Sequence, residues 1–151
     1  MLSCQNVTRL KPDYEFFSSV INFIRHYVDE YHHIKEEDIL FKSVLEIKNC
    51  QHISVMLNEH NEGRKFIQEM GMALLSSDPD QLVSSARNYC YMMKDHIYKE
   101  ERIIYPIAEK FLDENIKIKI ENQYNSIQAD ELQDYDINSI IEKLVHPANP
   151  T

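Results

Sequence analysis

Residues 32–41 read HHIKEEDILF, and residues 96–105 read HIYKEERIIY. When the two stretches are aligned without gaps, they share a histidine, a lysine, two glutamates and an isoleucine. The matching pairs are His32/His96, Lys35/Lys99, Glu36/Glu100, Glu37/Glu101 and Ile39/Ile103. Each copy lies late in a long segment whose apolar residues recur with the period of an α-helix. We therefore expect two long helices that present matched side chains to each other across a helical core.

The histidine and the first glutamate of each copy lie on a helix face that is otherwise apolar. Residues four apart share one face of a helix. Steps of four through the first segment give Val20, Ile24, Val28, His32, Glu36 and Leu40. In the later segment, His96 and Glu100 interrupt a similar run of methionines and isoleucines. A single histidine-glutamate pair of this spacing is usually a solvated surface pair. Two copies within apolar stripes instead favour side chains that are buried and bind a metal ion.

A buried carboxylate without a partner costs on the order of several kcal/mol. A cation held by imidazole and carboxylate would satisfy all four groups at once, so the expected metal ligands are His32, Glu36, His96 and Glu100. Mixed ligation of this kind suits iron, manganese or zinc better than calcium or magnesium.

The segment between the two copies supplies a third candidate histidine. His60 lies on an apolar stripe with Ile53, Met56 and Ile67, so we expect it to be a metal ligand as well. Glu59 and Glu62 flank it and are expected to face solvent. His33 is turned by about 100° from the stripe of His32, and we expect it to be a supporting or edge ligand.

Proline and aspartate residues mark where the helices begin. Pro79 follows Asp78 in the pattern of a helix start, and Pro106 should kink or divide the helix that contains it. The expected helices span 13–46, 52–75, 79–112, 114–128 and 136–145. With only two glycines, the chain lacks the turn residues of an all-β fold. The fold class we expect is all-α, a single helical-bundle domain over residues 1–151.

Composition excludes several classes of function. The formal net charge is −9 and no cluster of Lys and Arg is present, which argues against binding to nucleic acid. No apolar run approaches the ~20 residues of a membrane span, and the first residues lack the apolar stretch of an export signal. The three scattered cysteines fit reduced thiols. We expect a cytoplasmic protein.

The motifs resemble those of a known family. Residues 32–41 are similar to the HH-x-KEE-x-x-LF signature of hemerythrin-like (HHE cation-binding) domains, residues 58–64 resemble that family's EH-x-x-GR motif, and residues 96–106 resemble its HI-x-KE-x-x-x-x-[FY]P motif. The resemblance covers about residues 10–145. It implies an up-and-down bundle around a di-iron centre, with mononuclear iron or zinc as alternatives. By this resemblance Glu36 and Glu100 would bridge the metals, and His32, His60 and His96 would be terminal ligands.

The resemblance departs from the family at the start of the chain. The family's first helix carries a further ligand histidine, and this sequence has no histidine before His26. The chain therefore resembles a family member without its first helix. We expect the core face that this helix would cover to pack against the C-terminal helices or against a second copy in a homodimer.

Three functions remain open, in this order of preference. The first is a module, not an enzyme, that binds or senses dioxygen or a related small molecule, or iron itself. The second is a di-iron redox enzyme that acts on peroxide or nitric oxide, or that repairs iron centres. The third is a metal-free interaction bundle, in which the candidate ligands would point apart or form salt bridges.

Overall fold

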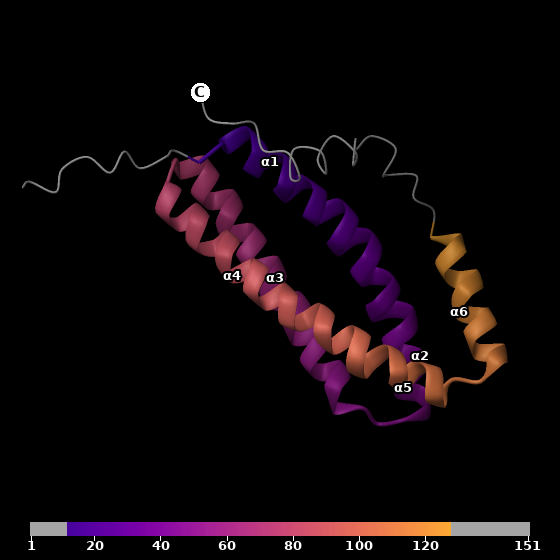
Figure 1. Ribbon diagram of the computed structural model, residues 1–151. Coiled ribbons are helices and arrows are strands. Elements are labelled where there is room, and N and C mark those ends of the chain that lie inside the picture. The colour runs from indigo at the N-terminus through magenta and orange to yellow at the C-terminus, as the bar shows by residue number, and fades with distance from the viewer. Residues whose placement is uncertain (1–11, 128–151) are drawn as a thin grey trace, which may run out of the picture.

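The computed structural model describes residues 12–127, and these residues form four continuous helices (Figure 1). The first long helix joins α1 (Tyr14–Phe23), the π-helical segments η1 (Ile24–His33) and η2 (Lys35–Leu40), and α2 (Phe41–Ile47). The second is α3 (Gln51–Ser76). The third joins α4 (Pro79–Lys99), the π-helical η3 (Glu100–Ile104) and α5 (Tyr105–Phe111). The fourth is α6 (Glu114–Ser126). The helix expected over 136–145 lies outside the described residues.

Aspartate side chains begin three of these helices. Asp13 accepts a hydrogen bond from the Phe16 amide at 3.0 Å, and Asp113 accepts one from the Ile116 amide at 2.9 Å. Asp78 accepts from two amides of the first turn of α4. Each such cap satisfies amide groups that have no partner within the helix. The all-α class expected from the sequence is confirmed.

The third long helix does not end at Pro106. The π-helical segment η3 lies just before it, and the helix continues as α5. Proline removes one amide donor and crowds the carbonyl four residues earlier. A change in hydrogen-bond register immediately upstream of Pro106 is consistent with that disturbance.

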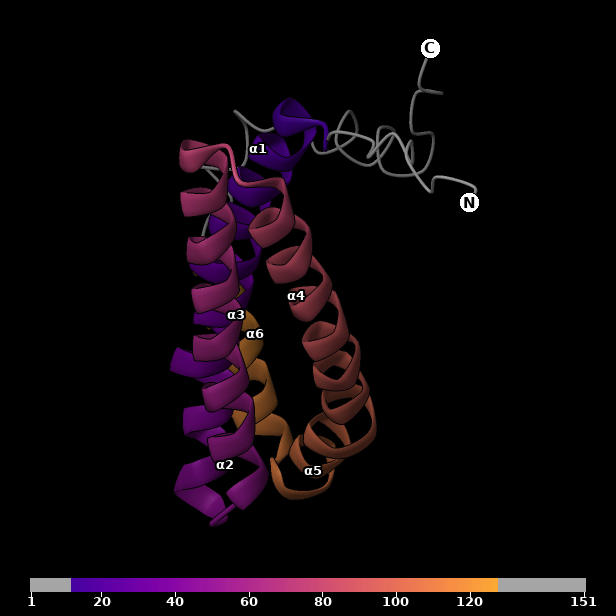
Figure 2. The same cartoon turned by 90° about the vertical axis from the view of Figure 1, so that its left-hand side faces the viewer.

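The three long helices pack side by side, with α3 and α4 forming an antiparallel pair (Figures 1 and 2). Their buried apolar residues form two clusters. One contains Ile39, Phe41, Val44, Cys50, Ile53, Met56, Ile104, Ala108, Leu112 and Ile120. The other contains Ile21, Ile24, Ile67, Met70, Ala73 and Leu82. Along all three helices the buried histidines and glutamates lie between these two clusters, so a polar layer separates two apolar ones.

The fourth helix, α6, packs against η2 of the first long helix (Figure 1). Its buried residue, Ile120, joins the same apolar cluster as Phe41 and Ile53. No helix among the described residues combines the length and apolar character that a membrane span requires.

Candidate metal centre

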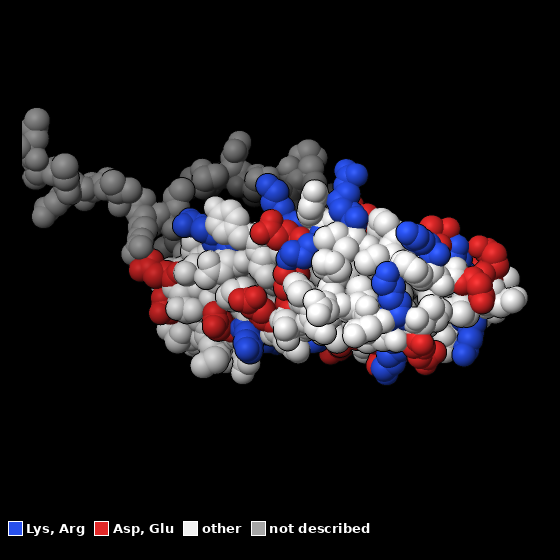
Figure 3. Space-filling model, turned by 90° about the horizontal axis from the view of Figure 1, so that it is seen from below, with Lys and Arg blue, Asp and Glu red and all other residues white. Residues whose placement is uncertain are grey.

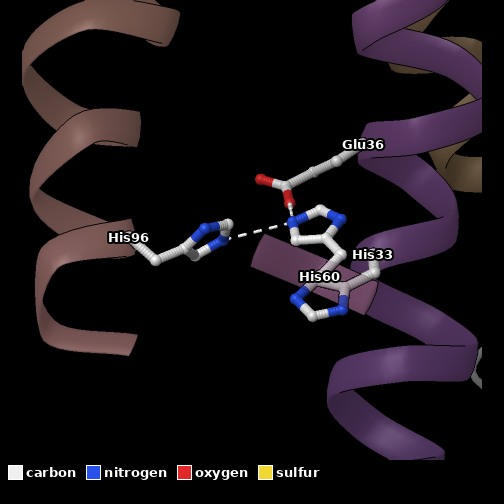
Figure 4. Close-up of side chains that lie close together, drawn as sticks. All are labelled: His33, Glu36, His60 and His96. Carbon is white, nitrogen blue, oxygen red and sulfur yellow. Dashed lines mark hydrogen bonds and ion pairs between the residues drawn. The ribbon is translucent and has the colours of Figure 1, made fainter. Parts of the chain in front are cut away.

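Six donors from the three long helices, five of them buried and one exposed, form two overlapping groups. The ligand atoms of His33, Glu36, His60 and His96 all lie within 4.8 Å of one another, and the same holds for His32, Glu36 and Glu100. Figure 4 shows the side chains of the first group converging from different helices. Glu36 belongs to both groups, so the arrangement resembles two adjacent sites that share one carboxylate.

The first long helix buries His33 more deeply than His32, the reverse of the order expected from the sequence. His33 is 2% exposed, whereas the side chain of His32 is 46% exposed. In an α-helix, Ile24 and His33 would lie on faces about 180° apart. Because η1 is π-helical over Ile24–His33, each turn takes more residues, and both side chains face the core. The Nε2 atom of His32 still lies 3.5 Å from Oε1 of Glu36.

Each of the three buried imidazoles has its Nδ1 atom next to a carboxylate. The distances are 3.0 Å from His33 to Asp29, 2.7 Å from His60 to Glu37, and 3.1 Å from His96 to Glu59. A carboxylate at Nδ1 favours the tautomer with its proton on that nitrogen. The Nε2 lone pair is then directed toward the shared centre, which is the arrangement that metal-binding histidines adopt.

Cationic side chains hold these carboxylates in turn. Arg64 donates to Glu37, and its Nε atom also lies 3.9 Å from Asp29. Lys99 donates to Glu59. The expectation that Glu59 faces solvent is therefore wrong: its side chain is 15% exposed. It lies between His96 and Lys99 because it projects from α3 toward the third long helix.

The two glutamates of the centre differ in their surroundings. Burial and the neighbouring Glu100 carboxylate raise the pKa of Glu36 to about 8. Tyr105 donates to Oε1 of Glu36 at 3.0 Å. Burial also tends to raise the pKa of Glu100, but the hydrogen bond and charge of His96 outweigh it, and the net pKa lies below the usual range. Glu36 is thus the carboxyl that holds a proton near neutral pH in the metal-free protein.

The pKa values of the buried His60 and His96 imidazoles shift in opposite directions. Burial, together with the nearby His33 and His96, lowers the pKa of His60 to about 2. Burial also tends to lower the pKa of His96, but Glu100 and Glu59 outweigh it and raise the net pKa. The Nε2 atoms of His60 and His96 lie 3.1 Å apart. Two lone pairs cannot approach so closely without a proton or another cation between them.

Two buried ligand atoms, Nε2 of His33 and Oε2 of Glu36, are left without a hydrogen-bond partner among residues 12–127. Oε1 of Glu100 has Nε2 of His96 at 2.9 Å. Buried polar atoms are normally paired, and both unpartnered atoms belong to the two donor groups. The chemistry of the set, imidazole nitrogen with carboxylate oxygen, fits iron, manganese or zinc. The cluster can therefore hold a metal ion.

From the sequence, His32, Glu36, His60, His96 and Glu100 were expected on inward faces. Four of them are buried and His32 is exposed, and the structure divides the five between the two donor groups that share Glu36. Sequence reasoning missed the supporting residues Asp29, Glu37, Glu59, Arg64 and Tyr105. Asp29 stands four residues before His33, a spacing that the sequence displays. Glu37 and Glu59 act on histidines of a neighbouring helix, so no pattern within one helix identifies them.

The comparison with protein families agrees with this geometry. The family model of the hemerythrin HHE cation-binding domain matches residues 3–118. This range includes all three long helices and every donor of the two groups. No curated protein and no solved structure gives a significant match.

Proposed function

Because the chain belongs to the hemerythrin HHE cation-binding family, we propose that its donor groups hold a pair of iron ions, and that the protein binds or senses dioxygen or a related small molecule through them. Family membership makes it a metal-binding helical bundle. That the metal is iron, and that it binds a small molecule, goes beyond family membership and is proposed here. The observation that carries it is the convergence of unpartnered buried ligand atoms on one place between the helices.

The proposed ligands divide between the two donor groups. His33, His60 and His96 would bind one ion through their Nε2 atoms, because each Nδ1 atom is already held by a carboxylate. His32 and Glu100 would bind the other, and Glu36, which is common to both groups, would bridge them. His33, expected from the sequence to be a supporting or edge ligand, is here a full ligand because it is buried. Glu100, which the resemblance made a bridge, is here a ligand of one ion.

When bound, a pair of iron ions would supply reversible change of oxidation state and a coordination position open to a small molecule. The chain's own residues prepare the place where this happens. The apolar clusters border the polar layer on two sides, and this low-dielectric surrounding strengthens the electrostatic interactions of its buried members. Tyr105 directs a hydroxyl proton at Glu36. The charges of Arg64 and Lys99 offset the carboxylates that orient the imidazoles.

A redox enzyme acting on peroxide or nitric oxide is the second candidate. It is favoured by the composition of the group His32, Glu36 and Glu100, which offers three protein ligands among residues 12–127, one of them exposed. A metal ion bound by this group would have a coordination position open to a substrate that enters from solvent.

The third reading, a metal-free bundle, expected the candidate ligands to point apart or to form salt bridges. They do not point apart, because the ligand atoms of each donor group lie within 4.8 Å of one another. His96 does lie 2.9 Å from Glu100, and His32 and His60 each lie 3.5 Å from Glu36, so the salt-bridge form of this reading is left to the metal-binding test.

The test of the proposal uses the full chain loaded with ferrous iron without oxygen. We expect dioxygen to change its visible absorption and removal of dioxygen to restore the first spectrum. Sustained consumption of peroxide with an added reductant, faster than free iron gives, would favour the enzyme. An iron-loaded protein whose spectrum responds to neither dioxygen nor peroxide would contradict both candidates. His33→Ala is expected to abolish the response, and His52→Ala, at an exposed histidine of α3, is the matched control.

A further inference from the structure

A pocket of about 370 Å³ lies between α6, η2 of the first long helix and the end of the third long helix. None of the residues of the two donor groups lines it. Its apolar walls are Leu40 of η2, Ala108 of α5, Leu112, which follows α5, and Ile120 of α6. A cavity of roughly 150 Å³ already holds benzene, and organic ligands occupy pockets of about 300–1,000 Å³. The size therefore suits a small organic molecule and exceeds what dioxygen needs.

The charges that line the pocket disfavour anionic ligands; both carboxylates are exposed and the one lysine is half-buried. Glu109 and Glu121 contribute carboxylates, and Lys117 is the cation that also lines the pocket. The ammonium group of Lys117 is already paired with Glu109 at 2.7 Å and with Glu114 at 3.2 Å. The remaining negative charge disfavours an anionic ligand. Figure 3 shows acidic and basic side chains interspersed on one face of the molecule.

Two tyrosines and Asn125 also line the pocket, and the tyrosines supply hydroxyl groups beside the apolar walls. The hydroxyl of Tyr105 donates to Glu36, and its oxygen keeps the capacity to accept a hydrogen bond. Tyr124 forms no hydrogen bond within residues 12–127, where its ring lies 5.6 Å from the Lys35 ammonium. A ligand with one hydroxyl can therefore donate to Tyr105 and exchange a hydrogen bond with Tyr124.

We propose that this pocket binds a small uncharged aromatic molecule with a hydroxyl group, such as a simple phenol, and that Tyr105 couples its occupancy to the metal centre through Glu36. The apolar walls take the ring, and the two tyrosines take the hydroxyl. Binding does not depend on the metal. The coupling rests on the proposed function, because it requires Glu36 to be a metal ligand.

Phenol is the probe for binding, and the protein without added metal is the sample. We expect amide NMR shifts confined to α5, α6 and η2, and an affinity higher than that for benzoate. Ala108→Leu fills the pocket and is expected to weaken phenol binding about tenfold or more. Ala86→Leu, a half-buried alanine of α4 in the other apolar cluster, is the matched control and should leave binding unchanged.

Tyr124→Phe tests the pocket without changing its volume. It should weaken phenol about twofold to tenfold, the value of one hydrogen bond, and should leave toluene binding as in the wild type. If Ala108→Leu does not fold, the comparison of phenol with toluene in Tyr124→Phe tests the proposal by itself. Phenol that binds both variants as tightly as the wild type, or that shifts amides elsewhere, would overturn the proposal.

The coupling is tested by measuring phenol affinity with and without bound cobalt(II). Linkage is reciprocal, so we expect cobalt to change phenol affinity about threefold or more, or phenol to change cobalt affinity by the same factor. Equal phenol affinities with and without cobalt(II) would contradict the coupling but not the binding of phenol in the pocket. Failure of cobalt to bind would count against the proposed function and the coupling, while the phenol titration of the metal-free protein would still stand.

Discussion

At the scale of single residues, the centre depends on how each imidazole is oriented. His33, His60 and His96 all have Nδ1 beside a carboxylate and Nε2 facing the shared centre. The same orientation arises three times from different helices, with carboxylates contributed both by the histidine's own helix and by its neighbour. An imidazole held in this way needs no rotation to bind a metal ion, so the protein has already met part of the cost of binding.

Arg64 is predicted to support metal binding without touching the metal. It donates to Glu37 and lies near Asp29, the carboxylates that orient His60 and His33. Arg64→Gln should lower metal affinity by about tenfold, and Arg64→Lys should recover only part of it because one ammonium cannot reproduce the guanidinium fork. Competition with a chelator measures the effect. Lys42→Gln, in an exposed pair with Asp38, is the control, and equal losses in the two variants would contradict the assignment.

Metal binding is predicted to release protons. With a pKa raised to about 8, Glu36 is protonated at neutral pH in the metal-free protein, and the pKa of His96 is raised as well. Protons and metal compete for the same atoms, so metal affinity should rise as pH rises toward about 8 and level off above it. Calorimetry in buffers of different ionisation enthalpy should detect about one to two protons released near pH 6.5. A proton count that stays at zero across this range would contradict the protonation states described here.

At the scale of helices, most of the architecture could be predicted from local signals. The caps Asp13, Asp78 and Asp113 mark helix starts in the sequence, and the first three helices begin and end close to the expected positions. The π-helical segments could not be predicted in this way. The stepwise pattern of Val20, Ile24, Val28 and His32 assumes α-helical turns, and it selects His32 where the structure buries His33.

The reason lies in what stabilises a π-helical segment. Its hydrogen bonds span one more residue than those of an α-helix, and no local residue preference in this sequence announces them. The segments η1, η2 and η3 contain four of the six donors, His32, His33, Glu36 and Glu100, and functional sites are where such irregularities are frequently found. The supporting carboxylates were missed for a related reason, because Glu37 and Glu59 contact histidines of other helices.

Gly63 is predicted to set the distance between α3 and α4. A Cβ atom built there would lie 3.1 Å from the terminal methyl of Met92 and 3.5 Å from the Tyr89 ring. Gly63→Ala should change the free energy of unfolding by less than about 1 kcal/mol, since the flexible Met92 can yield and alanine favours the helix. Gly63→Leu should destabilise by about 1–3 kcal/mol through overpacking. Urea denaturation measures both.

The matched control for Gly63 is the other glycine of the same helix. A Cβ atom at Gly71 would approach only the end of the Arg25 side chain, at 3.0 Å, and that long side chain can move away. Gly71→Leu should therefore cost clearly less than Gly63→Leu. Equal costs at the two positions would show that close contact with α4 is not what requires glycine at position 63.

At the scale of the whole molecule, a polar layer divides the apolar core in two. In the metal-free protein this layer keeps unpartnered buried atoms, which cost free energy. Metal ions would satisfy them and link all three long helices at mid-length. Metal should therefore stabilise the folded state, by about 4 kcal/mol when its free concentration is a thousandfold above the dissociation constant. Thermal unfolding with and without metal measures this, and an unchanged midpoint would contradict it.

The most direct test of the central claim is the number of metal ions bound per chain. The wild-type protein, purified from iron-replete cells, is compared with the double variant His60→Ala/His96→Ala, whose folding is checked by circular dichroism. We predict about two metal ions per wild-type chain, mostly iron, as in carboxylate-bridged helical bundles, and close to none in the folded double variant. A folded wild-type protein without bound metal, or a double variant that keeps the full amount, would contradict the account.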